Sequence, residues 1–323
     1  MDRAEPLGLA LASLKPTSQN EYRGAISSFL RHCRRKRLRM HNWEQVDYNL
    51  CHYMVHTFRR SGNASGRQKC SKARSALLFF CPELSNKLVL SNKSLRGWEK
   101  LAPSQQHVPF PYELAVGAAY QLFRRGKVEM AIGVLLQFDC YLRINELLAL
   151  KPKDIIFLAH PPSPTSAVPT DAGTLVLLRT KGGTNQSVTF RGPLLYVWLR
   201  RLTTSTGPHN KVFRFSEDSF RRNITAALRD LSCPFLKVSS HGLRHGGATR
   251  DAELGVPITT IQLRGRWRRV STAYQYLQQG VVASLRTQIP TATGRLLHRL
   301  CNNLLYYFNV DDFVGGVGDQ GTS

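Results

Sequence analysis

Strand-forming sequence occurs in one short region of this chain, between residues 154 and 190, while helical periodicity runs through the rest. Three segments of this region have β composition: residues 154–158, 174–180 and 185–190. The last two flank Lys-Gly-Gly-Thr, and two strands around a Gly-Gly turn form a hairpin. We therefore predict an α+β fold, mainly helical with a small β-sheet.

The first third of the chain, residues 17–105, shows helical periodicity without a strand signal. The apolar residues of its first segment recur at i, i+4, i+7 and i+8, which places them on one helix face: Tyr22, Ile26, Phe29 and Leu30. We expect Thr17 or Ser18 to cap this helix, and further helices near residues 46–60 and 66–80. The sequence thus predicts a small all-helical domain.

A polar, proline-bearing segment, Leu101–Pro111, follows this domain and has the composition of a linker. We therefore predict two domains, a helical one over residues 17–105 and a mixed one over residues 106–310. Residues 1–16 should form a flexible arm and residues 311–323 a disordered tail. Helices of the mixed domain are expected near residues 112–125, 128–149, 192–203, 217–231, 241–254, 257–264 and 270–279.

The chain is strongly basic, with 45 Lys and Arg against 21 Asp and Glu and a formal net charge of +24. Residues 1–105 hold 19 basic and 7 acidic residues and residues 106–323 hold 26 and 14, so each part carries +12. A folded protein this basic usually binds a polyanion, most often nucleic acid. Two basic domains could grip one duplex from both sides.

Several other classes of protein are disfavoured. No apolar run approaches the roughly 20 residues that a membrane-spanning helix needs, and the first residues do not resemble a signal peptide. The seven Cys are scattered without a CxxC pair, which supports neither a zinc ribbon nor a disulfide framework. We expect an intracellular, DNA-associated protein with no membrane partner, located in the nucleus in a eukaryote or in the cytoplasm or nucleoid in a bacterium.

A basic cluster lies at the end of the first predicted helix: Arg31, Arg34, Arg35, Lys36, Arg37 and Arg39. It could contact phosphates, or it could be a solvated helix end or a nuclear import signal. The candidate DNA-binding residues are Arg34, Arg35, Lys36 and Arg37, with Arg266 and Arg268 from a second basic stretch.

Two elements of the mixed domain carry charged side chains suited to chemistry. Arg143 and Glu146 lie three residues apart and would share a helix face, although an ordinary surface ion pair is the alternative. Lys181 lies at the tip of the predicted hairpin, where an ammonium group can reach over a ligand. A solvated turn lysine is the alternative there.

Two further elements lie toward the end of the mixed domain. One is a motif whose members fall on a single helical face: His241, Arg244 and His245. Polar caps at a helix N-terminus are the alternative for it. The other is Trp267 with Tyr274 and Tyr276, which are two residues apart and so lie roughly 200° apart on a helix. Only one of the two tyrosines can then face a given site. The alternative is that both pack against the protein without a functional role.

Together these elements supply arginines, a lysine, a histidine, an indole N–H and a phenol, without a set of metal ligands. Arginine forks bind the nonbridging oxygens of a phosphate in bidentate fashion. A tyrosine can act as a covalent nucleophile, and a lysine can protonate a departing alkoxide. This inventory suits the chemistry of a phosphodiester.

The set resembles that of the tyrosine recombinases, the phage integrase family that includes Cre and the Xer recombinases. The family shows an Arg, a hairpin Lys, His-x-x-Arg, a His or Trp and a Tyr, which match in order Arg143, Lys181, His241, Arg244, Trp267 and Tyr276. In the family the His or Trp precedes the nucleophile by nine residues. The same spacing separates Trp267 from Tyr276 here and selects Tyr276 over Tyr274.

The resemblance is specific over residues 135–280, where Glu146 occupies the family's acidic position and His245 follows the second arginine. Over residues 17–105, the helical character, the charge and the position fit the family's core-binding domain. The proline-rich stretch His160–Thr170 has no clear counterpart and is expected to be a loop insertion.

The resemblance implies that Tyr276 attacks the scissile phosphate of double-stranded DNA and forms a 3′-phosphotyrosyl link. Arg143 and Arg244 would bind the nonbridging oxygens, Lys181 would protonate the leaving 5′-oxygen, and His241 would act as acid or base or orient the phosphate. Trp267 would donate its indole N–H or pack against the nucleophile's helix. No ATP, metal, other cofactor or small-molecule substrate is implied, and the partner copies would form a homotetramer on two DNA sites.

A leucine stripe beyond Pro290 has two interpretations: Leu296, Leu297, Leu300, Leu304 and Leu305. It could dock into a neighbouring protomer, as C-terminal helices of the family often do, or it could close the protein's own core.

Three functions remain open from the sequence. The first is a site-specific recombinase or integrase of a mobile genetic element. The second is a non-catalytic DNA-binding protein derived from such a recombinase. The third is an enzyme resembling type IB topoisomerases, which would relax supercoils without a defined site.

Overall fold

The computed structural model describes five stretches of the chain: residues 10–103, 107–158, 172–180, 183–239 and 241–309. The chain divides into two compact units, Met1–Gln106 and His107–Ser323. Three predicted features lie outside the described residues, namely the loop insertion at residues 160–170, the hairpin-tip Lys181 and the tail at residues 311–323.

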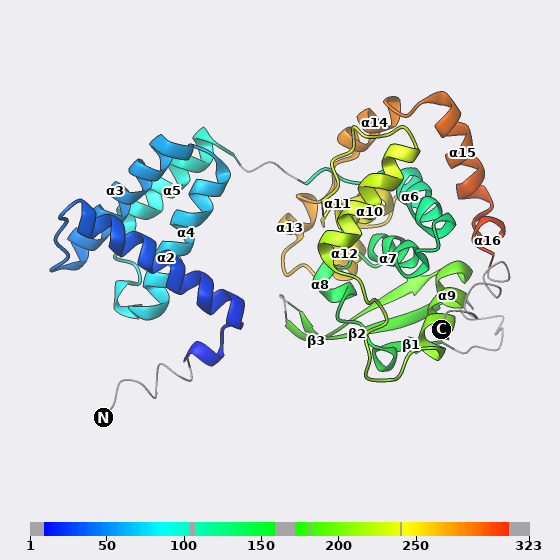
Figure 1. Cartoon of the computed structure of the whole chain (residues 1–323), viewed down its shortest axis with the longest axis horizontal. Helices are drawn as coiled ribbons and strands as arrows, with labels where there is room; N and C mark the ends of the chain where they lie inside the picture. Colours follow the sequence, from blue (N-terminus) through cyan, green and yellow to red (C-terminus); the bar gives the residue numbers. More distant parts are fainter. Residues whose placement is uncertain (1–9, 104–106, 159–171, 181–182, 240, 310–323) are drawn as a thin grey trace, which may run out of the picture. The chain divides into compact units, whose positions relative to one another are not determined.

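The described part of the first unit consists of helices α2 (Pro16–Arg35), α3 (Trp43–Ser61), α4 (Ala64–Phe80) and α5 (Val89–Leu101), with a 3-10 turn, η1 (Pro82–Leu84) (Figure 1). The sequence indicated the first three of these helices but not α5. The predicted cap of the first helix is wrong, because Lys15 is the N-cap and Pro16 takes the first helical position, for which its fixed φ is suited. Within the predicted arm, residues 10–12 are helical.

An apolar core joins the four helices of this unit, and its buried members include Phe29, Leu50, Met54, Cys70 and Trp98. Asn42 and Asn63 cap α3 and α4, because their side-chain oxygens accept from the backbone N–H groups of Gln45 and Gly66, each at 2.9 Å. The basic end of α2 is therefore carried on a packed helical scaffold.

The second unit contains the small sheet that the sequence predicts. Its strands are β1 (Ile155–Phe157), β2 (Ala172–Thr180) and β3 (Gly183–Arg191), antiparallel in the order β1-β2-β3. Thr180 pairs with Gly183, so β2 and β3 form an antiparallel hairpin. The predicted α+β fold class is confirmed.

The helices of this unit are α6 (Tyr112–Arg124), α7 (Val128–Asp139), α8 (Ile144–Leu147), α9 (Pro193–Thr204), α10 (Glu217–Asp230), α11 (Gly242–Glu253), α12 (Ile258–Gly265), α13 (Val270–Tyr274), α14 (Gln279–Thr287), α15 (Thr291–Asn302) and α16 (Leu304–Tyr307), with a 3-10 turn, η2 (Pro152–Asp154), before β1. Helices α6 and α7 pack against each other and form the centre of the core, where Leu114, Leu122, Ile132 and Leu136 are fully buried. Among the helices that pack on this pair are α10, α11 and α15 (Figure 1).

Most of the leucine stripe after Pro290 packs on the core of its own unit, whereas Leu305 is 53% exposed. Leu297 and Leu300 of α15 are 1% and 0% exposed, and Leu297 lies against Gly117 of α6. After α16, the indole N–H of Trp198 donates to the carbonyl of Phe308 at 3.0 Å. The described residues therefore show this segment packed in cis.

Two predicted helices end early, and both breaks lie beside candidate site residues. The helix predicted over residues 128–149 ends at Asp139, and Tyr141 then adopts a left-handed φ of 46° before α8 begins. The helix predicted over residues 270–279 ends at Tyr274, and α14 begins at Gln279.

Candidate active site

The structure brings together candidate residues from separate segments of the second unit. Arg244 lies in the first turn of α11, Trp267 lies two residues after α12, and Tyr276 lies two residues after α13. The guanidinium carbon of Arg244 is 4.8 Å from the ring centroid of Trp267 and 5.5 Å from that of Tyr276. A guanidinium, an indole and a phenol therefore share one site, while Lys181 lies outside the described residues.

Arg244 is fully buried, and two backbone carbonyls hold its guanidinium. Nη1 donates to the carbonyl of Tyr141, and Nη2 donates to the carbonyl of Gly265 at 2.5 Å. Burial, followed by the charges of Arg143 and Arg266, lowers the pKa of Arg244. Its Nε is buried and has no acceptor among the described residues. An added anion would satisfy this donor and offset the accumulated positive charge.

Tyr276, rather than Tyr274, packs into the site. Its ring stacks on His245 at 4.2 Å between centroids and meets Trp267 at 4.5 Å, whereas Tyr274 is 58% exposed. The hydroxyl of Thr249 donates to the carbonyl of Tyr276 at 3.0 Å and so fixes the turn that carries the phenol. In the described part of the chain, the buried indole N–H of Trp267 has no acceptor either.

Three histidines form a continuous series of ring contacts beside this cluster. The ring of His241, at the start of α11, stacks on His107 at 4.8 Å, and His107 meets the edge of His245 at 5.9 Å. Through these ring contacts, His241 is connected with Tyr276. Burial, then the charges of His107, His241 and Arg244, lowers the pKa of His245 to about 3, so its imidazole is neutral at physiological pH.

Arg143 and Glu146 form a partly buried pair, not the surface pair that was the alternative. Nη1 of Arg143 lies 2.6 Å from Glu146 Oε1, and the Arg143 backbone N–H donates to Oε2 at 2.9 Å. Arg266 reaches the same carboxylate at 2.8 Å. Burial by itself raises the pKa of Glu146, but Arg266 and Arg143 together bring this pKa below its ordinary value.

The position of Arg266 does not support the DNA contact predicted for it. Its side chain is 3% exposed and is engaged with Glu146 and with the carbonyls of Cys140 and Tyr141. Arg266 is better described as a support for Glu146. Arg268, the other candidate of that stretch, is exposed.

Replacing Glu146 by Gln should destabilise the second unit by about 3 kcal/mol, because Arg266 would be left buried without a countercharge. The measurement is urea unfolding at pH 7. The pKa of Glu146 is lowered in the folded state, so the difference in free energy of unfolding between Glu146→Gln and wild type has its full size at neutral pH. This difference begins to decrease below the unfolded-state pKa of about 4.3 and vanishes below the folded-state pKa. The control is Glu129→Gln, whose partner Arg214 is 73% exposed, and an equal cost for both variants would contradict the assignment.

A second ion-pair network joins the helices that carry the site to the end of α7. Arg264 donates from Nε and Nη2 to the carbonyl of Asp139, at 3.0 and 2.9 Å, and from Nη2 to its carboxylate at 2.8 Å. The hydroxyl of Tyr141 donates to Asp251 of α11. These contacts connect the last turns of α11 and α12 to the break after α7.

Sequence reasoning missed His107 and the network around Arg264. Arg264 and Arg266 flank a glycine directly before Trp267. This Arg-Gly-Arg-Trp pattern was the sequence signal that could have indicated that both arginines support the site. His107 lies in the segment interpreted as a linker, and nothing in its surroundings distinguishes it.

Helix α11 can reach the site because Gly247 allows close packing on α7. A Cβ at this position would lie 2.0 Å from the carbonyl oxygen of Phe138. Gly247→Ala should therefore destabilise the second unit by about 3 kcal/mol in urea unfolding. Gly294→Ala in α15 is the control, because its Cβ meets nothing within 4 Å, and it should be neutral or stabilising by about 0.5–1 kcal/mol. Equal effects of the two variants would show that the close approach is unimportant.

The arrangement suits attack by a phenol on a bound tetrahedral oxyanion. Arg244 supplies a fixed positive charge. The Nε of Arg244 and the indole N–H of Trp267 are buried donors without an acceptor among the described residues, and the backbone of Tyr276 is held beside them. Preorganised donors of this kind stabilise charge that develops in a transition state.

Comparison with solved structures shows the same fold. A Tn1549 transposon integrase in complex with transposon right-end DNA has a TM-score of 0.58 at 13% identity and covers 89% of this chain and 95% of that chain. A second structure of that integrase, with a circular-intermediate DNA, has a TM-score of 0.52 at 12% identity over 72% and 81% of the two chains. XerH site-specific recombinase bound to a palindromic difH substrate scores 0.51 at 14% identity over 71% and 68%.

Comparison with curated protein sequences gives no match. The sequence profile of the phage integrase family matches residues 118–281, just over half of the chain. This range contains the arginines, the indole and the phenol that the structure brings together. The chain therefore belongs to the phage integrase family, the tyrosine recombinases.

Proposed function

We propose that this protein is a site-specific DNA recombinase that cleaves and rejoins strands through a 3′-phosphotyrosyl intermediate. The observation that carries the proposal is the convergence of Arg244, Trp267 and Tyr276 in a domain of the phage integrase family. A net charge of +24 suits a DNA partner, and the transposon integrase and XerH structures with the same fold are complexes with DNA.

In the proposed reaction, the Tyr276 oxygen forms a bond to the scissile phosphorus while the bond from phosphorus to the 5′-oxygen breaks. Arg143 and Arg244 bind the nonbridging oxygens. Lys181 protonates the leaving 5′-oxygen, and His241 accepts the phenol proton or orients the phosphate. A 5′-hydroxyl from another strand then attacks the phosphotyrosyl link and releases Tyr276. The link conserves the energy of the phosphodiester, so strand exchange consumes no ATP.

The remaining candidate residues have supporting roles in this proposal. Trp267 donates its indole N–H to the phosphate or packs against the nucleophile, and His245 positions the phenol ring by stacking. Glu146 holds Arg143. Residues 17–105 act as the core-binding domain, and four copies assemble on two DNA sites of a mobile genetic element.

Covalent trapping on a mixed library of duplexes tests the proposal whatever the target sequence is. Each duplex has a randomised sequence and one nick, so that the short 5′-hydroxyl fragment diffuses away after cleavage, which prevents religation. Denaturing electrophoresis should then show protein joined to DNA, and sequencing of the trapped DNA should show an inverted repeat. Absence of an adduct despite salt-sensitive DNA binding would favour the non-catalytic DNA-binding protein. Adducts without a sequence preference, accompanied by supercoil relaxation, would favour the topoisomerase-like enzyme.

A further inference from the structure

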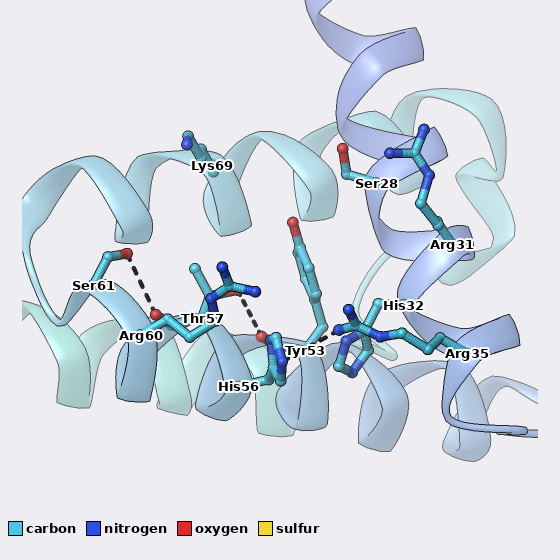
Figure 2. A pocket seen from close by; sticks show the side chains of 10 residues that line it. All are labelled: Ser28, Arg31, His32, Arg35, Tyr53, His56, Thr57, Arg60, Ser61 and Lys69. Atoms are coloured by element: carbon cyan, nitrogen blue, oxygen red, sulfur yellow. Dashed lines mark hydrogen bonds between the residues drawn. The ribbon is translucent and has the colours of Figure 1, made fainter.

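A pocket of about 510 Å³ opens in the first unit between α2, α3 and α4 (Figure 2). Four cationic side chains line it: Arg31, Arg35, Arg60 and Lys69. None of the described residues that line it is acidic. Two other cations of this unit do have a carboxylate partner, since Arg67 pairs with Glu99 and Lys72 with Glu21. The pocket therefore concentrates positive charge without a countercharge from its own wall.

Histidines form one side of the pocket. His32 of α2 is 4% exposed, its Nε2 lies 2.9 Å from His52 Nδ1, and its ring lies 4.8 Å from that of His56. Figure 2 shows Arg35 facing His56, and Nη2 of Arg35 lies 3.2 Å from His56 Nε2. Because a guanidinium can only donate, His56 Nε2 is the acceptor and this imidazole is neutral in the arrangement seen.

A buried polar atom without a partner lies at the same place. Nδ1 of His32 is inaccessible to solvent and has no hydrogen-bond partner among the described residues. The Tyr53 side chain extends from α3 toward Ser28 and Lys69 and adds a hydroxyl to the lining (Figure 2). Guanidinium, ammonium, imidazole and hydroxyl groups are the donors that proteins use for phosphate oxygens.

We propose that this pocket is a binding site for a phosphate group, held by Arg35, Arg60 and Lys69 and backed by the histidines of α2 and α3. The phosphate is either a backbone phosphate of DNA or a free phosphate compound. The first source rests on the proposed function, whereas the pocket itself does not.

Phosphate binding is expected to be coupled to protonation of the histidines. Burial, then the charges of His56, His52, Arg35 and Lys36, lowers the pKa of His32 to about 4, and burial with Arg35, Arg60, Lys36 and His52 lowers that of His56. The facing groups are Arg31 and Arg35 from α2 with Lys36 directly after it, His52, Tyr53, His56 and Arg60 from α3, and Lys69 from α4. A bound anion favours the imidazolium form, so binding raises the pKa values of His32 and His56. Binding is therefore accompanied by uptake of a proton by these imidazoles. Affinity then increases as the pH falls through the pKa of the bound state.

The test uses the full chain labelled with ¹³C at the histidine ring and titrated with inorganic phosphate at constant ionic strength. The resonances of His32, His52 and His56, assigned with single His→Gln variants, should shift saturably. The double variant Arg35→Gln/Arg60→Gln should lose about tenfold or more in phosphate affinity at these resonances. The control double variant, Arg23→Gln/Arg59→Gln, removes the same charge from exposed positions of the same helices outside the pocket and should titrate like wild type.

The same spectra separate this pocket from the candidate active site, because His107, His241 and His245 report on the latter. Phosphate shifts confined to those three residues, or equal behaviour of the two double variants, would overturn the proposal. Titration with sulfate, whose charge is constant from pH 5.5 to 8, should show affinity at the pocket increasing severalfold as the pH falls. A pH-independent affinity would overturn the coupling to the histidines.

Duplex DNA identifies the source of the phosphate. If the pocket holds a backbone phosphate, the salt dependence of DNA binding should be weaker by about one charge in Arg35→Gln/Arg60→Gln than in the control. If the double variant loses phosphate binding but the salt dependence of its DNA binding is unchanged, the pocket binds a free phosphate compound. Failure of wild type to form a covalent DNA adduct would count against the recombinase proposal, while the histidine shifts would still decide whether the pocket binds phosphate.

Discussion

The Tyr276→Phe protein should form no covalent adduct with a nicked duplex, a loss of at least about 10⁴-fold in cleavage rate. The substitution removes the attacking oxygen and little else. The ring can keep its stack on His245 and its contact with Trp267, and the backbone carbonyl can still accept from Thr249. DNA affinity and the unfolding transition should therefore remain close to those of wild type.

Tyr274→Phe provides a matched control for this experiment. It removes the same hydroxyl two residues away, from a side chain that is 58% exposed. Adduct formation should persist at the wild-type rate. An adduct with Tyr276→Phe, or loss of the adduct with Tyr274→Phe, would show that the nucleophile has been misassigned. Mass spectrometry of the nuclease-trimmed adduct would locate the modified tyrosine directly.

The selection of Tyr276 over Tyr274 illustrates what sequence spacing can supply. On a regular helix the two phenols would lie about 200° apart, and it was the resemblance to the recombinases, with their interval of nine residues after the His or Trp, that selected Tyr276. The structure places Tyr276 in a turn after α13, where a helical face has no meaning, yet it is Tyr276 that contacts Trp267. The interval was informative because a short connection of fixed length joins the two residues.

The helix breaks at Asp139 and Tyr274 were not predictable from periodicity. After Asp139 the chain continues with buried apolar residues, and periodicity cannot distinguish a continuing helix from a turn that is also buried. The reason for the first break lies far away in sequence. Arg264 binds the carbonyl of Asp139, and Arg244 and Arg266 bind the carbonyl of Tyr141, and these carbonyls are free to accept because the helix ends there.

The polar supports of the site were missed for the same reason. Arg264 and Asp139 are separated by 125 residues, and Arg266 and Glu146 by 120. From the sequence alone, a basic stretch such as the one around Trp267 is interpreted as facing solvent or binding DNA, because its acidic partners lie far away in the chain. The fold class was easier to predict, because the β-hairpin and the amphipathic helices are local features.

Arg244 is the residue whose replacement should affect both stability and catalysis most clearly. Arg244→Lys keeps the charge but cannot reproduce the fork that reaches the carbonyls of Tyr141 and Gly265 together. At least one of the two buried hydrogen bonds from position 244 is lost, so the second unit should lose about 1–3 kcal/mol of stability in urea unfolding. Cleavage should be slower by about 10²–10³-fold, the usual cost of losing one preorganised donor to a transition-state oxyanion.

The pH dependence of the Arg244→Lys protein separates a catalytic role from a structural one. Burial and the charges of Arg143 and Arg266 lower the pKa of the group at position 244. A lysine begins with a lower intrinsic pKa than arginine, so in this environment its ammonium should lose its proton within an accessible pH range. The residual cleavage by the variant should then decline as the pH rises, while wild-type Arg244 remains charged.

Arg229→Lys on the exposed end of α10 is the control, and it should match wild type in stability, rate and pH profile. A purely structural role for Arg244 would lower the stability of the lysine variant without giving its remaining activity a new dependence on pH. The cleavage rates of Arg244→Lys and wild type should be compared at a temperature where both proteins are fully folded. Equal rates would show that the guanidinium of Arg244 does not contact the reacting phosphate. The unsatisfied Nε donor of Arg244 argues for contact, because a buried donor without an acceptor costs stability unless a ligand supplies one.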